Sequence, residues 1–347
     1  MVHRIFLSAL ACLMPVAAQR LPSTHTPLKP PLESLTANSV RVILFDGPGA
    51  TQTYPTSINN SGTVTGFYAD AHGGHGFLRE LDGSFVTFDA PSSQNIYPSS
   101  INTAGEVAGN YSTTTTQYGF LRTADGTWIT FDVPGTFPSS SGNPIGINNS
   151  GVIAGPYFDG EMHGFLRNAD GSLITIDAPD STYTYPTGIN NGGLITGIYA
   201  DVTYNSHGFV RGSGGQWVSF NVPGDNFGFF PPTLSINNEG VVVGSYLEGS
   251  TTEGFLWQPG SQLTTFQVAG AAITMPSGID SSGAVVGSYQ DSTSTYHGFV
   301  RSAAGVVSTF SIPGAIETYG VGMNDSGVIV GSYQDKSYAS HGFLLIE

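Results

Sequence analysis

The chain has 347 residues, of which 10 are basic and 25 acidic, giving a formal net charge of −15. This balance argues against nucleic acid as a partner and favours a cation or a basic surface. With 39% hydrophobic and 12% aromatic residues, the composition excludes a disordered chain and predicts a large buried core.

The N-terminal segment predicts export. Residues 1–18 contain a basic Arg4, an apolar run and small residues before Gln19, which is typical of a secretory signal peptide. The single cysteine, Cys12, lies in this segment, so the mature chain would have no thiol. Residues 19–40 are rich in Pro, Ser and Thr and predict a flexible spacer. No later stretch is long and apolar enough to span a membrane, and we expect a secreted or periplasmic monomer.

From residue 41 onward the chain is a repeat. The first central motif begins Ile58-Asn59-Asn60-Ser61-Gly62, and its copies follow at steps of 43, 46, 42, 47, 43 and 44 residues. Each copy continues with a block like His-Gly-Phe-Leu-Arg and most close with a block like Thr-Phe-Asp-x-Pro. The seven copies begin at Ile58, Ile101, Ile147, Ile189, Ile236, Ile279 and Met323.

Short apolar runs separated by Gly, Asn, Asp and Pro predict four strands in each copy. In the first copy these are residues 55–59, 63–68, 76–80 and 84–89. Seven copies predict an all-β fold over residues 41–347, a seven-bladed β-propeller with four antiparallel strands per blade. A closing block at residues 41–46 precedes the first copy, and the last copy lacks one. We therefore expect the N-terminal strand to pair into the C-terminal blade and close the ring.

Two residue types suggest local departures from a regular strand. A Gly stands two residues before the Tyr of every copy, as Gly66 does before Tyr68, and we expect it where blades crowd together near the axis. Pro156 interrupts the second strand of the third copy, and we expect a local bulge there.

Spacing indicates which face is free to vary. The interval from the His position to the closing Asp position is 14 residues in all six copies where both occur, and that from the first Ile to the Tyr is always ten. By contrast, the interval from Tyr to His position runs from 6 to 8 residues, and that from the closing position to the next Ile from 12 to 15. In an up-and-down blade the two variable connections emerge on one face, which we call the variable face. Function is usually carried where loops vary.

The variable face provides two sets of candidate ligand-binding residues. The first lies four residues before each Ile, where an aromatic ring at the channel mouth could stack on a sugar or peptide or could close the end of the core; both interpretations stay open. Its members are Tyr54, Tyr97, Tyr185, Met275 and Tyr319, together with Asn143 and Pro232. Two longer loops add Phe137, Phe227, Phe229 and Phe230, of which Phe229 is the chosen contact candidate.

The second set is a ring of carboxylates two residues after each Tyr. It could attract cations or a basic partner, but an Asp that follows a strand more often caps its own loop. The six are Asp70, Asp159, Asp201, Glu248, Asp291 and Asp335, with Thr113 in the remaining copy.

Recurrent His and Arg residues are better explained by structure than by chemistry. A metal needs converging ligands, whereas the five histidines lie a blade apart. We expect hydrogen bonds across paired strands instead, from His75 to Asp89, His163 to Asp177 and His207 to Asn221. The recurrent arginines predict pairing between blades on the fixed face, and they are Arg79, Arg122, Arg167, Arg211 and Arg301.

No catalytic motif stands out from the repeats. The Asn-Asn-Ser-Gly turns contain no carboxylate for calcium. There is no Gly-x-Ser-x-Gly elbow, phosphate loop or His-Glu-x-x-His helix. The sequence therefore predicts no catalytic residue, no metal and no cofactor.

The recurring blocks Ile-Asn-x-x-Gly-x-Val-x-Gly-x-Tyr, His-Gly-Phe-Leu-Arg and Thr-Phe-Asp-x-Pro resemble the bacterial extracellular repeat proteins of the HAF family, named for a His-Ala-Phe block. Tyr118 and Glu253 replace the His in two copies. The resemblance spans residues 41–347 and implies secretion and a propeller-like array rather than an activity. Gly replaces the Ala of that block at Gly76, Gly164, Gly208, Gly298 and Gly342.

Three functions are compatible with this sequence. The first is a binding module that recognises a glycan or extracellular protein through the variable face. The second is a carbohydrate lyase or hydrolase, and two carboxylates about 5 to 10 Å apart over an open pocket would favour it. The third is a purely structural surface repeat. Candidate carboxylates for the enzyme are Asp159, Glu161, Asp180, Asp201 and Asp225.

Overall fold

The computed structural model describes residues 40–91, 93, 95–114, 116–132, 145–225, 227 and 234–346. The predicted signal peptide and spacer, apart from Val40, lie outside these ranges. So do Phe229 and several other residues of the two longer loops, among them Phe137, Asn143, Phe230 and Pro232.

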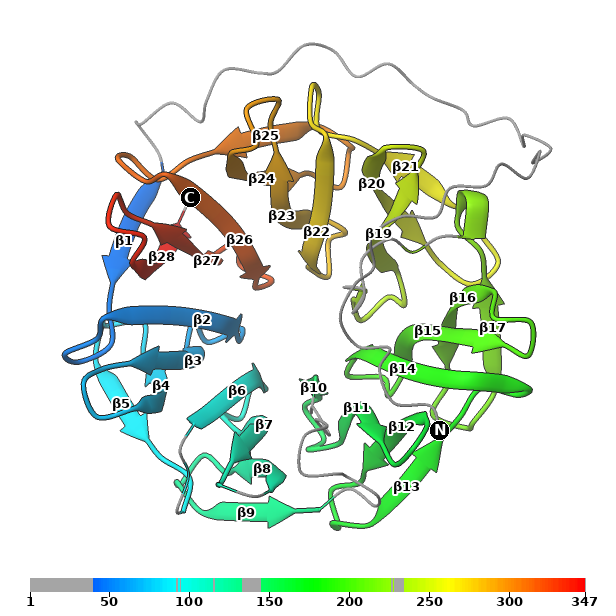
Figure 1. Ribbon diagram of the computed structural model, residues 1–347, viewed down its shortest axis with the longest axis horizontal. Helices are drawn as coiled ribbons and strands as arrows, with labels where there is room; N and C mark the ends of the chain where they lie inside the picture. The colour runs from blue at the N-terminus through cyan, green and yellow to red at the C-terminus, as the bar shows by residue number, and fades with distance from the viewer. Residues whose placement is uncertain are drawn as a thin grey trace, which may run out of the picture.

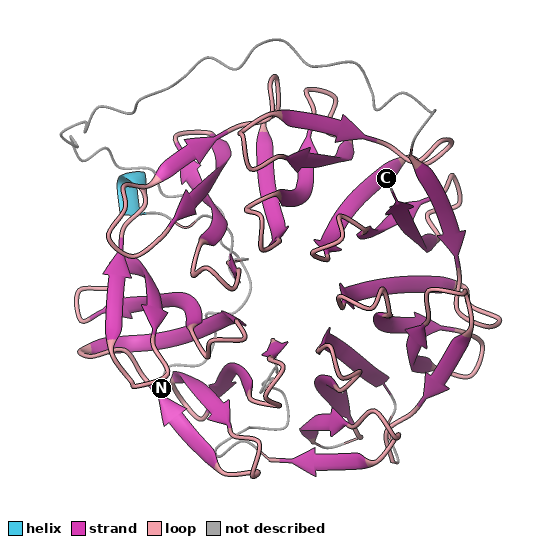
Figure 2. Cartoon of the chain, turned by 180° about the vertical axis from the view of Figure 1, so that it is seen from behind, coloured by secondary structure: helices cyan, strands magenta, loops and turns pink. Residues whose placement is uncertain are grey.

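The fold is all-β and propeller-like. Its strands form four-stranded antiparallel sheets that stand side by side around a common axis (Figure 1). In the described ranges the one helical element is the 3-10 turn η1 (Pro223–Asp225), drawn in cyan in Figure 2. None of the described helical structure has the length and apolar character needed to cross a bilayer.

Each sheet runs from an innermost strand at the axis to an outermost strand at the rim. The innermost strands are β2 (Gln52–Ile58), β6 (Asn95–Ile101), β10 (Gly146–Ile147), β14 (Ser181–Ile189), β18 (Ser235–Ile236), β22 (Ile273–Ile279) and β26 (Glu317–Met323). The second strands are β3 (Val64–Ala69), β7 (Val107–Ser112), β11 (Ile153–Phe158), β15 (Ile195–Asp201), β19 (Val242–Glu248), β23 (Val285–Gln290) and β27 (Ile329–Gln334).

The outer half of each sheet repeats just as regularly. The third strands are β4 (Gly74–Arg79), β8 (Gln117–Arg122), β12 (Met162–Arg167), β16 (Ser206–Arg211), β20 (Thr251–Trp257), β24 (Tyr296–Arg301) and β28 (Ser340–Ile346). The outermost strands are β1 (Arg41–Phe45), β5 (Phe85–Phe88), β9 (Trp128–Phe131), β13 (Leu173–Ile176), β17 (Trp217–Phe220), β21 (Thr264–Phe266) and β25 (Val307–Phe310).

Two pairings connect strands beyond a simple meander. Strand β1 pairs antiparallel with β28, from Arg41 opposite Ile346 to Phe45 opposite Gly342. Residues 41–45 are therefore the outermost strand of a sheet whose other strands come from the C-terminal part. A single parallel bridge between Thr252 and Ile273 joins the β18–β21 sheet to the β22–β25 sheet.

The buried core is built from the third-strand Phe of every copy, and this explains the recurrent Gly. A Cβ at Gly66 would lie 2.2 Å from the Tyr54 carbonyl oxygen and 2.8 Å from the Phe77 ring, both in its own sheet. The expectation that blades crowd at this Gly was therefore wrong, because the space is filled from within the sheet. The core rings, each at most 1% exposed, are Phe77, Phe120, Phe165, Phe209, Phe255, Phe299 and Phe343.

Pro156 does not cause the bulge that we expected. Strands β11 and β12 pair in unbroken register, with Pro156 opposite Gly164. On its other side, in the described part of the chain, β11 pairs with β10 only at Ile153 and Ala154. The pairing of β11 with β12 therefore accommodates Pro156 without a shift in register.

The predicted pairing of arginines between sheets is confirmed for four of the five, and the partner is an aromatic ring rather than a carboxylate. The Arg79 guanidinium lies 5.0 Å from the centroid of Phe45, which belongs to β1 in the neighbouring sheet. Such a cation–π contact suits a buried guanidinium. Arg211 differs, since it lies over Trp217 of its own sheet. The other pairs are Arg122 with Phe88, Arg167 with Phe131 and Arg301 with Phe266.

The sheets are joined at the axis by a ring of side chains that we call the asparagine belt. Its first member is Asn59, whose Oδ1 accepts the N–H groups of Ser61 and Thr63 in its own turn, each at 3.0 Å. Its Nδ2 donates to the Asn102 carbonyl of the next sheet at 3.0 Å. The belt consists of Asn59, Asn102, Asn148, Asn190, Asn237, Asp280 and Asn324.

The belt joins the last copy to the first but is interrupted at one member. Asn324 donates to the Asn59 carbonyl at 3.1 Å, a contact between residues 265 positions apart. Asp280 receives the bond from Asn237 at its carbonyl, but a carboxylate has no N–H to pass on to Asn324. The belt therefore lacks one bond, at the junction between the β22–β25 sheet and the sheet containing β26.

We expect the substitution Asp280→Asn to raise the free energy of unfolding by about 1 kcal/mol, the usual value of one added hydrogen bond. The new amide can still accept from the Ala284 N–H, as the Asp280 carboxylate does, and can also donate to Asn324. Urea unfolding followed by tryptophan fluorescence measures the change.

A substitution that removes one belt amide is the control. Asn190→Ala removes a buried amide and leaves the Leu194 N–H and Asn237 carbonyl without that partner, so it should lower stability by about 1 to 3 kcal/mol. An Asp280→Asn protein less stable than the parent would contradict this account of the gap.

Candidate functional site

The axis holds two cavities between the innermost strands. The larger, of about 560 Å³, is lined by residues from the middle to the end of these strands, and Tyr97 and Tyr185 are among its lining residues nearest the variable face. The smaller, of about 180 Å³, is lined by the asparagine-rich turns at the strand ends. Isoleucines such as Ile58 and Ile189 line both cavities and so lie between the larger and the smaller one.

Aromatic rings surround part of the mouth of the larger cavity. Tyr97 and Tyr185 line it, as does Phe67, which sequence reasoning had not selected. The Tyr54 ring stacks on Phe67 with centroids 5.0 Å apart, and Tyr97 meets Phe67 edge-on at 5.2 Å. Tyr97 is 40% exposed although it is a large aromatic residue. We call Tyr54, Phe67 and Tyr97 the aromatic rim.

The remaining mouth candidates have different positions. Tyr185 is only 9% exposed and also packs into the core, so both interpretations of this position apply to it. Met275 and Tyr319 lie in β22 and β26 but do not line the cavity. The Tyr319 hydroxyl donates to the Glu317 carboxylate, and its ring packs 5.2 Å from Tyr296. Phe229 lies outside the described residues.

A tier of hydroxyl groups lies below the rim, and sequence reasoning missed it. Each hydroxyl residue follows a Pro of an innermost strand, where the register with the second strand shifts, as between Pro55 and Ser57. The hydroxyl donates to a second-strand carbonyl nine residues on and so occupies the bulge. The bonds are Thr56 to Thr65 (3.3 Å), Ser99 to Ala108 (3.0 Å), Thr187 to Thr196 (3.4 Å) and Ser277 to Val286 (3.2 Å). The Pro-Thr and Pro-Ser pairs were the available signal.

The smaller cavity has a polar floor made by the second residue of each turn. The Asn149 N–H donates to Asn191 Oδ1 in the next sheet at 2.9 Å. At the end of the series Asp325 accepts from the Ser281 N–H and from Asn60 Nδ2 at 2.9 and 2.7 Å. These side chains therefore join sheets as well as line a cavity.

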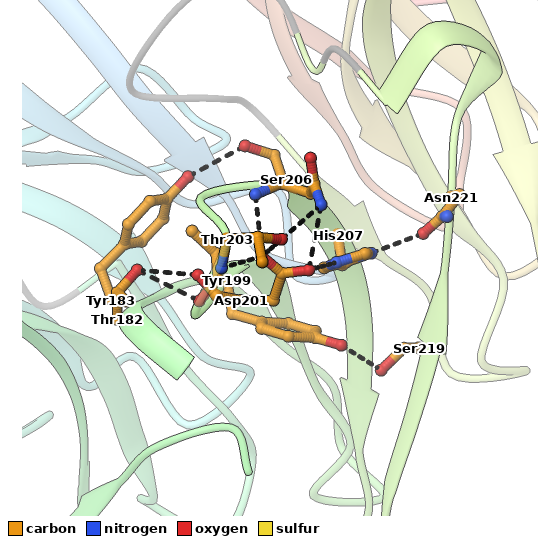
Figure 3. Close-up of polar contacts among 11 residues, drawn as sticks. Thr182, Tyr183, Tyr199, Asp201, Thr203, Ser206, His207, Ser219 and Asn221 are labelled. Carbon is orange, nitrogen blue, oxygen red and sulfur yellow. Dashed lines mark hydrogen bonds and ion pairs between the residues drawn. The ribbon is translucent and has the colours of Figure 1, made fainter. Parts of the chain in front are cut away.

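The carboxylates of the variable face line neither cavity, and the interpretation as loop caps is confirmed for the aspartates. Figure 3 shows one copy, in which Asp201 Oδ1 accepts the N–H groups of Thr203 and Asn205 at 2.8 and 3.0 Å. Hydrogen bonds from the Thr203 hydroxyl and the Asn205 N–H hold the pKa of Asp201 well below its usual value. Asp70, Asp159, Asp291 and Asp335 accept from their own loops in the same way. Glu248 differs, since only its backbone carbonyl accepts a loop hydroxyl.

The recurrent histidines make the hydrogen bonds predicted for them and a second contact to the loop aspartate. His75 Nδ1 lies 2.7 Å from Asp89 and Nε2 lies 3.2 Å from Asp70. The ring also packs 5.1 Å from Tyr68. The other predicted bonds are His163 with Asp177 at 2.9 Å and His207 with Asn221 at 2.7 Å.

In two copies both the His and the loop Asp are replaced by other residues. In the second copy Tyr118 stacks on Tyr111 at 5.3 Å, and the loop residue is Thr113. In the fifth copy the Tyr246 hydroxyl donates to Glu253 at 2.9 Å, and this carboxylate and burial raise the pKa of Tyr246. The His is thus part of a structural unit with the loop Asp, because both are replaced in the same copies.

The geometry that would favour an enzyme does not occur in either cavity. Among the described lining residues the larger cavity has no carboxylate and the smaller has Asp325 alone. The described His, Cys, Asp and Glu side chains also form no group of three that could hold a metal ion.

We expect the stability provided by His75 to depend on pH. Burial lowers the pKa of His75, but its hydrogen bonds and charge interactions with Asp89 and Asp70 outweigh this, so the pKa is raised. A neutral imidazole has one N–H and can donate to only one carboxylate. The contribution should be complete below the unfolded pKa of about 6.5 and disappear as pH rises through the higher folded pKa.

Urea unfolding of His75→Gln and the parent at several pH values measures this difference. His72→Gln is the control, because the His72 side chain is 85% exposed and its Nδ1 lies 3.6 Å from Asp70, beyond hydrogen-bond distance. The difference in the free energy of unfolding between the parent and His75→Gln should shrink as pH rises. A difference that grows with rising pH would contradict the stabilising role given to protonated His75.

Comparisons with known proteins support the fold and no activity. No family model matches the chain, and no curated protein matches it. It is similar to a catalytically inactive virginiamycin B lyase from Staphylococcus aureus solved with quinupristin, with TM-score 0.60, 13% identity and coverage of 89% of this chain and 100% of that one. The β-propeller domain of the Trilobed protease from Pyrococcus furiosus gives TM-score 0.57, 7% identity and coverage of 84% and 95%.

A third similar structure is the Cps50 (Swd1) β-propeller domain of Myceliophteria thermophila, with TM-score 0.52, 8% identity and coverage of 87% and 98%. These neighbours have different roles, and identities this low establish architecture alone. By fold, this chain is a β-propeller-like protein.

Proposed function

We propose that this protein is an exported binding module that recognises a glycan or an extracellular protein at the mouth of its larger axial cavity. The observation that carries the proposal is a cavity of about 560 Å³ with aromatic rings at its mouth, one of them 40% exposed. Binding sites commonly have this size and combine apolar walls with a few polar groups. Exposed Tyr side chains are frequent binding anchors because they bury much area at a low entropic cost.

The proposal includes a closed ring of seven blades. It is supported by the pairing of β1 with β28 and by the Asn324 bond to Asn59, since both join the last repeat to the first. A closed ring would fix the size of the axial cavity. Export and membership of the HAF family remain part of the proposal, on the strength of residues 1–18 and the repeated blocks.

The carboxylate ring of the variable face is a weaker candidate for the binding surface than the cavity mouth. Its aspartates are occupied by their own loops and by His side chains, so fewer oxygen lone pairs remain for a ligand. The enzyme alternative would need a pair of carboxylates over the cavity, and the described lining residues provide none.

We expect the substitution Tyr97→Ala to weaken ligand binding at least about tenfold, the effect typical of a central aromatic anchor. Arrays of defined oligosaccharides and of synthetic peptides, probed with the full chain, identify the ligand, and calorimetry measures its affinity. The loss should follow because Tyr97 is the most exposed ring of the aromatic rim.

Tyr338→Ala is the matched control. Tyr338 is 72% exposed in the loop after β27 but lines neither cavity, so its loss should leave affinity unchanged. Equal affinities of the parent and Tyr97→Ala proteins, with a loss only in Tyr338→Ala, would place the site on the loops and reject the cavity mouth.

A further inference from the structure

We infer that the ligand of the larger cavity is an uncharged saccharide, whose hydroxyl groups donate hydrogen bonds to the hydroxyl tier. This inference rests on the proposed binding function and names its ligand class. It does not follow from the overall charge of −15, which would by itself favour a cationic ligand.

The first argument is the absence of charge in the wall. The described residues that line the cavity include no Asp, Glu, Lys, Arg or His, although the chain has 25 acidic residues. A charged ligand would lose its water there and find no ion of opposite sign. Burying an unpaired charge is far more costly than burying a hydroxyl that makes a hydrogen bond.

The acidic residue at the start of the innermost strand β26 is already engaged. Glu317 accepts the hydroxyl of Tyr319 and does not line the cavity. A cationic sugar such as glucosamine would therefore lack a carboxylate to pair with among the described lining residues.

The second argument is the direction of the hydrogen bonds in the hydroxyl tier. The hydroxyl hydrogens of Thr56 and Thr187 are donated to Thr65 and Thr196. A hydroxyl has one hydrogen and two lone pairs, so a group whose hydrogen is committed can only accept a further bond. The Ser277 hydroxyl likewise shares its one hydrogen between two carbonyls, those of Val286 at 3.2 Å and Gly320 at 2.8 Å.

Thr56, Thr187 and Ser277 therefore offer acceptors to the cavity from the equivalent position of strands β2, β14 and β22. A complementary ligand must carry several donors and no charge, which describes the hydroxyl groups of a neutral sugar. Peptide ligands fit less well, because each peptide unit carries a single donor, whereas each sugar ring carries several hydroxyl donors.

The third argument is the aromatic rim. Phe67 and Tyr97 line the cavity and Tyr54 stacks on Phe67, while Tyr54 and Tyr97 each stand two residues before a hydroxyl of the tier, Thr56 and Ser99. A sugar ring has apolar C–H faces and hydroxyls at its circumference. Contact with the rim and donation to the tier can then be made by one saccharide at once.

The test uses the full chain and an array with matched neutral, cationic and anionic oligosaccharides, together with synthetic peptides. The neutral series consists of glucose, galactose, mannose and xylose oligomers, the cationic one of glucosamine oligomers, and the anionic one of galacturonic acid oligomers. The strongest ligand is then titrated by calorimetry against variants of the hydroxyl tier. We expect it to be neutral, with charged analogues of the same length bound at least about tenfold more weakly.

Thr187→Val and Thr56→Val replace an acceptor with a methyl group of the same shape, and each should weaken binding about five- to tenfold. Thr264→Val is the matched control, since Thr264 is exposed on the outermost strand β21 and should leave affinity unchanged. Thermal unfolding of each variant checks that the fold is retained.

The outcomes separate the two proposals. A charged saccharide or peptide that binds most strongly, with binding lost in Tyr97→Ala, would overturn the neutral ligand and leave the binding function standing. A neutral saccharide whose affinity is the same in Thr187→Val and Thr56→Val would overturn the role of the hydroxyl tier. If no member of the panel binds the parent chain, both proposals fail.

Discussion

A single buried side chain at the start of each turn, Asn in every repeat except for Asp280, is the constraint on which the structure depends. Its carbonyl oxygen organises its own turn and its amide nitrogen ties that turn to the next sheet, as Asn59 does toward Asn102. The same side chain thus shapes each turn and ties its sheet to the neighbouring one. The turn between the first and second strands must keep the same number of residues for this geometry to recur. This explains why the interval from the first Ile to the Tyr is always ten residues. Variation is confined to the opposite face, where the described residues form no such belt.

The axial cavities reflect this division between fixed and variable ends. At the floor, turns built from nearly identical residues produce a polar cavity joined by hydrogen bonds between sheets. Toward the mouth the copies diverge, so aromatic rings gather at Tyr54, Phe67 and Tyr97 rather than around the whole circumference. A symmetric scaffold thereby acquires an asymmetric opening, which is what recognition of one ligand requires. Stability and specificity are provided by opposite ends of the same strands.

Features that recur in every repeat could be predicted from the sequence. Strands of the first copy lie within three residues of their predicted bounds, because period and turn residues both mark them. The His and loop Asp contacts were predictable from a constant spacing across a hairpin. The asparagine belt was not, because its partners are about 43 residues apart and a turn signature already accounts for Asn. Gly66 and Pro156 were misjudged for a related reason: which atoms fill the space beside a residue depends on packing within the sheet, and no spacing encodes it.

The interrupted belt shows how a repeat tolerates the loss of one of its members. At the junction where Asp280 cannot donate, the Ser277 hydroxyl reaches the Gly320 carbonyl of the next sheet, and the Ser281 N–H reaches Asp325. The same junction is therefore also bridged by the Ser277 hydroxyl, whose counterparts Thr56 and Thr187 donate to carbonyls of their own sheets. Because several hydrogen bonds join the same two sheets, the loss of one of them leaves the others in place. Individual belt residues can therefore be substituted without separating the sheets. Repetition thus provides tolerance to mutation as well as a scaffold.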